Sequence, residues 1–595
     1  GVVAGIGHYG NNMGIPTVNG AIYFDESYVG NVVVYCGCIG TLPISRYIRD
    51  AGPGHIIVLA GGRTGRDGIH GVTFASLELT EESEEVSRPA VQIANPIEEE
   101  KLARAIITIR DMELASSITD LGGGGLSSAV GETAHKFGCG AEVELERVPL
   151  KYPQIAPWEI YISESQERML LTVPVENLDG VLEAFESEGV EATAIGRLTR
   201  GGELRITYRG HTVADLDMDF LFSPPLTKRF AEWRKPTYEE PRIGEPENLT
   251  ELLLRILSSP NVASKEAVIR TYDHEVKGNT AVKPLCGRNG GPSDAAVLKP
   301  LERSWRGIVV SCGMNPRYGK IDPYWMAASA IDEALRNNLS VGGRRIALLD
   351  NFVWGTPEKP DRLGGLVRAC KACYRFAKGF GAPFISGKDS LYNESPLGPV
   401  TPTLLITAVG IIPDIRMAVT MDLKAPGNPV YILGRTRREL GGSEYYWLRG
   451  YLGMSVPKVR LGEARRTMNR LRRAIDRGYV EACHDLSEGG LGVAAAEMAF
   501  SGGIGLEVNL GMVPVSEGLR RSDYILFSES NSRFLVEVPK ARMEDFEETM
   551  RGAVYSLIGW TKKEESLTVY SPDGRRIIDV SLDLMMDAWK RTLGD

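Results

Sequence analysis

The chain has 595 residues, of which 43% are apolar and 24% are charged, a composition that is ordinary for globular proteins. Its formal net charge of −9 argues against a nucleic-acid-binding protein, and no run of 18 uncharged apolar residues indicates a membrane span. The length predicts roughly four domains. Eight cysteines do not suggest a disulfide framework in a chain of this length, so we expect a reducing, cytoplasmic setting.

The first half of the chain alternates apolar runs with glycine-rich loops. Residues 14–20, 31–40 and 56–60 predict strands, because each is a short apolar run bounded by turn-forming residues. Apolar residues at helical spacing predict a helix over 102–112. The proline-rich, charged stretch 224–246 predicts a linker that separates two halves of the chain.

The second half begins near Glu251 with a predicted helix. Residues 321–342 and 363–381 each carry a helical pattern that closes on a glycine. Between them, residues 344–350 form an apolar run that predicts a strand ending at Asp350. Residues 401–412 predict a second buried strand.

The chain also contains an internal duplication. Corresponding residues recur at a constant offset of 365, in the pairs Asp120 and Asp485, Glu132 and Glu497, Pro149 and Pro514, and Ser163 and Ser528. A similar offset relates residues 14–20 to residues 381–387, whereas residues 260–367 have no counterpart in the first half. We therefore expect a mixed α/β (α+β) fold in two copies around a pseudo-twofold axis, with the front of the first copy missing from this chain.

Asp120 and the four glycines after it are the first candidate site. An aspartate at a strand end, beside a flexible loop and a helix N-terminus, suits a phosphate with Mg²⁺. The alternative is a turn that needs glycine only for its backbone angles. The polar cluster of residues 163–166 suits a small polar ligand, or else forms a local turn.

Further strand-end residues point the same way. Asp350, Asp294 and the turn of residues 387–390 each serve more often as a cap or turn than as a ligand. Taken together with the glycine loops, they indicate Mg²⁺–nucleotide chemistry without a P-loop sequence.

Several motifs resemble one family. They are HYGNNMGIPTVNGAIYFDESY, GGRTGRDGIHG, VQIANP, the Asp120 loop, SESQERMLL, LLDNFVWGTPEKP, ISGKDSLYNE and HDLSEGGL. In order and over nearly the whole chain, they resemble the phosphoribosylformylglycinamidine synthase family, in its small, multi-chain form (PurL subunits) of archaeal type.

The resemblance implies tandem AIR-synthase-like (PurM-like) N- and C-terminal domain pairs. We expect the rest of a first N-terminal domain at 1–48, a first C-terminal domain at 49–223, a linker at 224–250, a second N-terminal domain at 251–424 and a second C-terminal domain at 425–595. The implied activity is that of a ligase of purine biosynthesis. It would convert formylglycinamide ribonucleotide, ATP and ammonia to the amidine, ADP and phosphate, through an imino-phosphate and with Mg²⁺.

The resemblance also implies roles for single residues. Asp120 falls on a metal ligand. Lys388 stands where many members have a metal-binding asparagine; a charged lysine cannot ligate Mg²⁺, which puts that second metal site in doubt and leaves a direct phosphate contact as the alternative for Lys388. Substrate contacts are implied for Gln92, Glu164, Ser165, Gln166 and Ser390, and nucleotide contacts for Asp350 and Gly387. The family's catalytic histidines would precede Gly1, so we expect this chain alone not to complete the reaction.

Ammonia is expected from a separate glutaminase chain (PurQ-like), since the sequence has no Cys–His glutaminase pattern, with a small bridging subunit (PurS-like). Two alternatives stay open at this point. One is another ATP-dependent PurM-like enzyme, such as a thiamine monophosphate kinase or a selenophosphate synthetase. The other is a non-catalytic assembly subunit.

Overall fold

The structure is a computed structural model that describes residues 1–47, 49–69 and 91–594. The contacts within it divide the chain into two compact units. Unit 1 comprises Gly1–Ile15 and Cys36–Lys228, and unit 2 comprises Pro16–Tyr35 and Arg229–Asp595. None of the helices in these described ranges has the length and apolar content that crossing a membrane requires.

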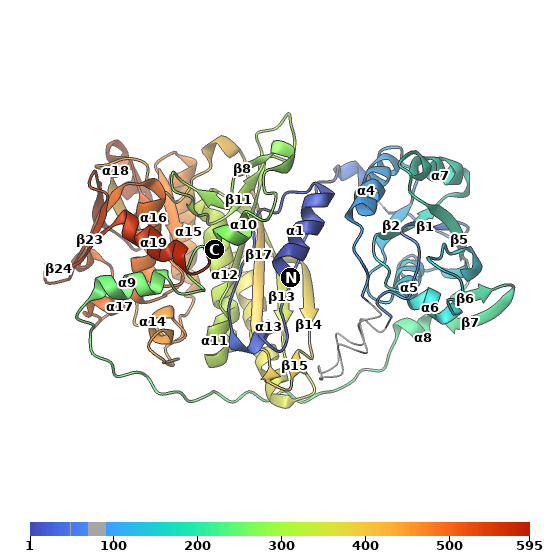
Figure 1. Ribbon diagram of the computed structural model, residues 1–595, viewed down its shortest axis with the longest axis horizontal. Helices are drawn as coiled ribbons and strands as arrows, with labels where there is room; N and C mark the ends of the chain where they lie inside the picture. Colours follow the sequence, from blue (N-terminus) through green and yellow to red (C-terminus); the bar gives the residue numbers. More distant parts are fainter. Residues whose placement is uncertain (48, 70–90, 595) are drawn as a thin grey trace. The chain divides into compact units, whose positions relative to one another are not determined.

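Unit 1 is built on a seven-stranded sheet in the order β2-β4-β1-β5-β3-β6-β7 (Figure 1). All neighbouring strands are antiparallel except β3 and β6, which are parallel. The strands are β1 (Ile56–Gly61), β2 (Ser117–Asp120), β3 (Gly140–Glu144), β4 (Arg168–Val173), β5 (Ala192–Thr199), β6 (Glu203–Tyr208) and β7 (His211–Asp217). The helices are α1 (Val2–Met13), α4 (Pro96–Asp111), α5 (Leu126–Lys136), α6 (Pro157–Ile162), α7 (Leu178–Ser187) and α8 (Met218–Phe222).

The central strand β1 explains why this sheet is covered on both faces. Its residues are apolar without interruption, as expected for a strand buried on both sides. Val58 and Ala60 pack into a core with α4 and α7, whereas Ile57 and Leu59 pack into another core with α5 and α6 (Figure 1). The alternation of side chains along the strand therefore feeds two separate cores.

Unit 2 repeats this sheet. Its seven strands follow the order β19-β21-β18-β22-β20-β23-β24, and the parallel pair, β20 with β23, lies at the same place in the order. The strands are β18 (Pro429–Leu433), β19 (Ala482–Asp485), β20 (Gly505–Asn509), β21 (Phe534–Glu537), β22 (Tyr555–Lys562), β23 (Ser566–Tyr570) and β24 (Arg576–Ser581). The identical strand order confirms the internal duplication and the mixed α/β class.

Unit 2 also contains a six-stranded sheet in the order β14-β13-β17-β12-β11-β8. Its strands are β8 (Thr280–Val282), β11 (Ala296–Leu298), β12 (Gly307–Met314), β13 (Arg344–Val353), β14 (Phe384–Ser390) and β17 (Thr403–Ile412). The predicted helices that close on glycine are confirmed as α12 (Pro323–Ser340) and α13 (Pro360–Phe380). Two short hairpins complete the strands, β9 (Leu285–Cys286) with β10 (Gly291–Pro292), and β15 (Glu394–Ser395) with β16 (Gly398–Pro399).

The remaining helices of unit 2 are short, except for α15 and α16. They are α9 (Leu249–Leu257), α10 (Glu266–Ile269), α11 (Pro316–Ile321), α14 (Glu444–Trp447), α15 (Leu461–Asp476), α16 (Gly490–Gly502), α17 (Ser522–Phe527), α18 (Met543–Met550) and α19 (Leu582–Arg591). Helix α16 is buried along almost its whole length, because its small residues allow close packing inside the C-terminal core of unit 2.

The strands predicted at residues 14–20 and 31–40 are wrong, because both segments are irregular in the structure. Their repeat counterparts lie around β14 and β17, which pair with β13. In the described part of the chain neither segment has a neighbouring strand of this kind, and a strand without hydrogen-bonding neighbours does not form. The intervening residues, with part of both segments, belong to unit 2, within which Lys320 pairs with Asp25 at 2.8 Å.

Candidate functional site

The loop that follows β2 is shaped by glycine. Gly124 and Gly125 have positive φ angles of 80° and 57°. A Cβ atom on Gly125 would lie 1.8 Å from the carbonyl oxygen of Ser163, so no other residue fits there. The Gly124 amide donates to Glu164 Oε1 at 3.0 Å. Glycine at these positions therefore lets the loop after Asp120 close against the loop of residues 163–168.

A buried arginine fixes this second loop. The guanidinium of Arg168 donates to the carbonyls of Ser165 and Ser163, both at 2.7 Å, and to Thr64 Oγ1 at 2.8 Å. Burial lowers the pKa of Arg168 to about 10, which still leaves it protonated at neutral pH. Glu167, just before it, has a left-handed backbone with φ of 55°. The loop is thus held in one conformation by three charge-assisted hydrogen bonds.

Gln92 lies against the same loop. Its Oε1 accepts from the backbone N–H of Gln166 at 2.7 Å, and its Nε2 donates to Glu167 Oε2 at 2.9 Å. The other carboxylate oxygen of Glu167 accepts from the Tyr9 hydroxyl and from the Asn95 amide, both at 3.2 Å. The structure therefore brings the four predicted substrate residues of unit 1 together, namely Gln92, Glu164, Ser165 and Gln166.

These four residues differ in what they can offer a ligand. Gln166 is exposed and Gln92 half-buried, so their amide groups are accessible. Ser165 is fully buried, and its hydroxyl contacts Asp67 and accepts from the Gly65 amide at 2.9 Å. Ser165 therefore holds the loop in place, while the two glutamines present polar groups to solvent.

Sequence reasoning missed Glu167 and Tyr9. Glu167 follows the predicted triplet directly, and this position was its only signal. Its role depends on the left-handed backbone, which turns the carboxylate back toward Tyr9, 158 residues away. Burial and the charge of Glu167 raise the pKa of Tyr9, so its hydroxyl stays protonated and donates.

Asp120 belongs to an acidic group in unit 1. Its carboxylate ends β2 and is exposed. Glu99, on the first turn of α4, has a pKa raised by burial and then by the negative charges of Glu167 and Asp120. A carboxyl group whose pKa is raised by two neighbouring carboxylates is suited to a divalent cation, which would relieve the repulsion.

The remaining predicted residues lie in unit 2, on the adjacent parallel strands β13 and β14. Asp350 is paired with Gly387, and Val353 with Ser390. A Cβ atom on residue 387 would lie 2.2 Å from Asp350 Oδ1, so glycine leaves room for this carboxylate. Burial and the charge of Asp389 raise the pKa of Asp350. The side chain of Lys388 is exposed, and its Nζ donates to the Asp389 carbonyl at 3.3 Å.

The second copy retains the loop but changes its ligand-facing residues. Arg533 repeats the role of Arg168, contacting the carbonyls of Ser530 and Ser528 and the Thr436 hydroxyl. The Gly489 amide donates to Glu529 at 2.9 Å, as Gly124 does to Glu164. Asn531 and Ser532, however, replace Gln166 and Glu167, and they face Ser329 and Asp332 on α12. The second copy therefore repeats the hydrogen bonds that hold the loop, but not the residues that could contact a ligand.

Two buried acids of the second copy carry raised pKa values. Burial, followed by the charge of Glu529, raises the pKa of Glu488 to about 8. Burial raises the pKa of Glu529 to about 7, although it accepts from the Gly489 amide and the Tyr318 hydroxyl. Both groups therefore hold a proton in the folded protein at a pH where the unfolded chain releases it.

We expect the stability of unit 2 to fall as the pH rises from about 5 to about 8, because the folded state binds more protons than the unfolded state over this range. Each such proton contributes a slope of about 1.4 kcal/mol per pH unit. Glu488→Gln should flatten this dependence, which urea denaturation at a series of pH values measures. The exposed Glu544→Gln is the control, and equal slopes for both variants would contradict the prediction.

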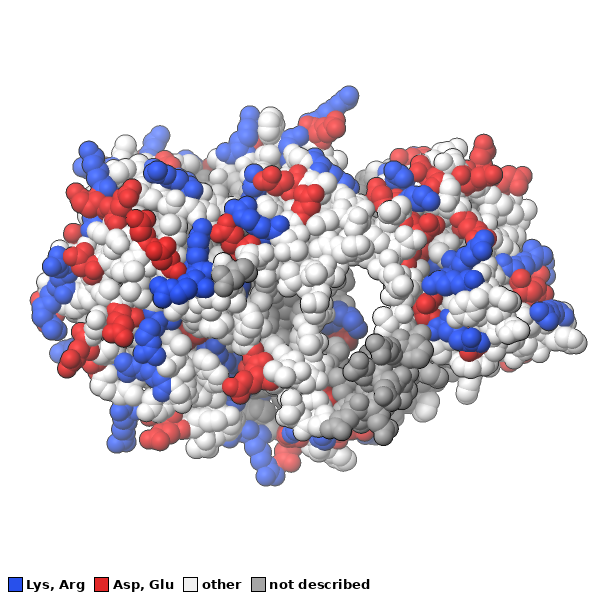
Figure 2. All heavy atoms as spheres, viewed as in Figure 1, with Lys and Arg blue, Asp and Glu red and all other residues white. Residues whose placement is uncertain are grey.

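On the face shown in Figure 2, basic and acidic side chains are interspersed, and neither sign gathers into a single area.

Comparison with known proteins gives two matching family profiles. The profile for AIR synthase related protein, N-terminal domain, matches residues 1–42 and 292–412. The profile for AIR synthase related protein, C-terminal domain, matches residues 52–209 and 425–571. Each profile thus matches the chain twice, in the order that the duplication requires.

Two curated relatives illustrate the similarity over the full chain. Phosphoribosylformylglycinamidine synthase subunit PurL of Thermoplasma acidophilum is 36% identical over 597 residues, covering 100% of this chain and 78% of the relative. The protein of the same name from Thermococcus sibiricus is 37% identical over 587 residues, covering 98% of this chain and 79% of the relative.

Solved structures share the fold at lower sequence identity. Thermotoga maritima PurL complexed with FGAR has a TM-score of 0.68 and 24% identity, covering 94% of this chain and 81% of that one. The structure of PurLQS from the same organism has a TM-score of 0.67 and 23% identity, with 94% and 81% covered. Thermotoga maritima PurL complexed with ATP has a TM-score of 0.65 and 23% identity, with 94% and 80% covered.

Proposed function

The chain belongs to the family of phosphoribosylformylglycinamidine synthase PurL subunits, and from this membership we propose how its own residues serve the reaction. The protein is an ATP-dependent ligase of purine biosynthesis, which converts formylglycinamide ribonucleotide and ammonia to formylglycinamidine ribonucleotide, with ADP and phosphate as the other products. The observation that supports a substrate site in unit 1 is the joining of Gln92 to the loop of residues 163–168.

In our proposal this loop binds formylglycinamide ribonucleotide. Gln92 and Gln166 would supply amide donors and acceptors to the substrate, because both side chains are accessible. Hydrogen bonds also fix both of them: Gln92 Oε1 accepts from the backbone N–H of Gln166, and Gln166 Nε2 donates to the carbonyl of Glu164. Glu164 and Ser165 would orient the loop through Gly124 and Asp67. Pre-positioned polar groups of this kind bind a small polar ligand without an added cost of ordering them.

We further propose that Asp120 holds Mg²⁺, with Glu99 and Glu167 adding negative charge nearby. When bound, the metal would neutralise charge on the phosphoryl group that ATP transfers to the amide oxygen. Asp350 and Gly387 would contact the nucleotide and Ser390 the substrate. The support for this assignment is the pairing of Asp350 with Gly387, where the absence of a side chain leaves backbone accessible beside a carboxylate.

The family membership also makes this chain part of a multi-subunit complex, as the name subunit PurL and the PurLQS structure indicate. We propose that a glutaminase subunit (PurQ-like) supplies ammonia, and that a small subunit (PurS-like) bridges the two. Ammonia would then displace phosphate from the imino-phosphate, which forms the C–N bond of the amidine.

The substrate site can be tested by calorimetric titration with formylglycinamide ribonucleotide. Gln92→Ala is expected to weaken binding by roughly 10-fold to 100-fold, the effect of losing one or two hydrogen bonds and leaving their partners unpaired. Glu167→Gln should weaken it less, by about 3-fold to 10-fold, because the charge-assisted bonds to Gln92 and Tyr9 become neutral ones.

The matched control is Gln154→Ala, which removes another exposed glutamine of unit 1 and should leave the affinity unchanged. Wild-type affinity in the Gln92→Ala variant would refute the proposed site. Equal losses in all three variants would point to general destabilisation instead of a specific contact.

A further inference from the structure

The second copy contains a dense group of buried acids at the place that corresponds to the Asp120 loop. Asp485 ends β19 as Asp120 ends β2, and each is followed by a leucine, a glycine-containing loop and a helix. Buried Asp332 and half-buried Glu333 on α12, buried Asp294 before β11 and buried Glu497 on α16 complete the group. Like charges at this density need positive charge nearby, because burying an uncompensated carboxylate is costly.

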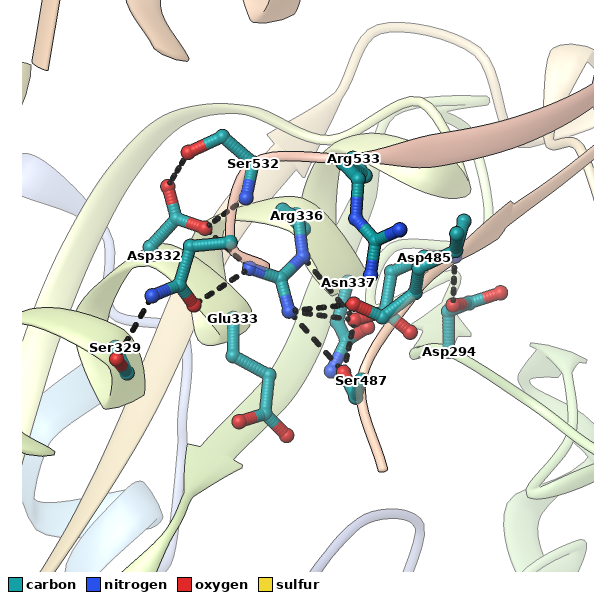
Figure 3. Close-up of polar contacts among 12 residues, drawn as sticks. Asp294, Ser329, Asp332, Glu333, Arg336, Asn337, Asp485, Ser487, Ser532 and Arg533 are labelled. Carbon is teal, nitrogen blue, oxygen red and sulfur yellow. Dashed lines mark hydrogen bonds and ion pairs between the residues drawn. The ribbon is translucent and has the colours of Figure 1, made fainter. Parts of the chain in front are cut away.

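Arg336 supplies positive charge to one side of this group. It lies one turn after Asp332 on α12, and only 2% of its side chain is exposed. Figure 3 shows its guanidinium between Asp332 on one side and Asp485 with Ser487 on the other. Its Nη2 and Nε donate to Asp485 Oδ2 at 3.0 and 3.2 Å, and Nη2 also donates to Ser487 Oγ at 3.1 Å.

His484 supplies positive charge to the other side. Its Nδ1 lies 2.9 Å from Asp294 Oδ1, and its Nε2 lies 3.0 Å from Glu497 Oε2. The two carboxylates raise the pKa of His484 above its usual value, although burial lowers it. Each ring nitrogen of His484 thus already lies within hydrogen-bond distance of a carboxylate.

The rival explanation of this group is a metal site. Ligand atoms of Asp294, His484 and Asp485 all lie within 4.8 Å of one another, and Asp294 Oδ2 is buried without a hydrogen-bond partner in the described part of the chain. Against this explanation, Nδ1 and Nε2 of His484 each face a carboxylate oxygen, and Oδ2 of Asp485 accepts from both Arg336 and Ser487. Both ring nitrogens of His484 and one of the two carboxylate oxygens of Asp485 are therefore already engaged by the protein.

We propose that Arg336 is the resident cation of the second copy, holding Asp485 where the equivalent Asp120 of the first copy would meet a divalent metal. The divergence of the loop supports this assignment. Ser532, in place of Glu167, donates its hydroxyl to Asp332 at 2.6 Å and its amide at 2.8 Å, and Asn531, in place of Gln166, accepts from Arg336 at 3.4 Å. The replaced residues have become partners of the ion pair, and the second copy keeps its fold without a metal.

The two copies should therefore differ in Mn²⁺ binding. Electron paramagnetic resonance measures the number of Mn²⁺ ions that the full chain and its variants bind. In an Asp120→Asn background we expect Asp485→Asn to remove no Mn²⁺, because the second copy holds none. A site that survives Asp120→Asn and is lost on adding Asp485→Asn would overturn the proposal. If Asp120→Asn by itself removes no Mn²⁺, the proposed metal ligand of the first copy fails, and the effect of Asp485→Asn still decides the role of Arg336.

Arg336→Met tests the same idea through stability. Removing a buried cation that pairs two carboxylates should lower the Tm of unit 2 by roughly 5–10 °C, and part of this loss should be recovered on adding Mn²⁺, which can then approach the freed acids. Arg344→Met is the matched control, since its pair with Asp476 is partly exposed and should shift the Tm by about 2 °C or less. An unchanged Tm for Arg336→Met would overturn the proposal, and the Mn²⁺ counts decide the question if this variant does not fold.

Discussion

Replacement of Arg168 by methionine is expected to lower the free energy of unfolding of unit 1 by about 3–5 kcal/mol. The guanidinium makes three hydrogen bonds to the carbonyls of Ser163 and Ser165 and to Thr64, and methionine can replace none of them. The loop of residues 163–168 should then exchange its amide hydrogens faster and lose its affinity for the substrate. Urea denaturation combined with hydrogen–deuterium exchange measures both effects.

The control for this variant is Arg197→Met. Arg197 is 62% exposed and pairs with Glu142 on the surface of the same sheet, so its loss should change the free energy of unfolding by less than about 1 kcal/mol. Equal destabilisation by the two substitutions, or unchanged exchange of the 163–168 amides in Arg168→Met, would show that the buried arginine does not hold the loop.

The second large effect is expected from Asp120→Asn. Loss of an outer partner of a metal ligand costs about 10-fold to 100-fold in metal affinity, so loss of a ligand itself should weaken Mn²⁺ binding by at least about 100-fold. Asparagine retains the size of the side chain and removes its charge, which leaves Glu99 and Glu167 as the nearby acids. Electron paramagnetic resonance titration of Mn²⁺ measures the change.

Stability should respond little to this substitution, because Asp120 is exposed. Asp179→Asn, at an exposed position on the first turn of α7, removes a similar charge from the same unit and should leave Mn²⁺ binding as in the wild type. If the two variants bind Mn²⁺ equally well, the metal is not held by Asp120.

The duplication was the part of the fold most accessible to sequence reasoning. An offset of 365 paired Asp120 with Asp485 and Ser163 with Ser528, and the structure places each pair at equivalent points of two sheets with the same strand order. A constant offset predicts the fold because corresponding residues adopt the same backbone conformation in both copies, as the positive φ angles of Gly125 and Gly490 show.

Features that depend on distant partners could not be predicted in this way. Residues 31–40 have strand-like composition, but without neighbouring strands they stay irregular. The role of Glu167 depends on a left-handed backbone and on Tyr9, which is remote in the sequence. Arg336 was missed because a charged residue in a helical pattern normally marks an exposed face, whereas α12 is buried on nearly all sides.

Hydrogen–deuterium exchange of the wild-type protein, with and without formylglycinamide ribonucleotide, tests most directly the claim that the first copy holds the substrate. We expect slower exchange around residues 91–99 and 163–168 and no change in the equivalent loop, residues 528–533. Thiamine monophosphate should have no effect on either loop. Protection of residues 528–533 alone, or no protection by formylglycinamide ribonucleotide at saturating concentration, would show that the first copy does not hold the substrate.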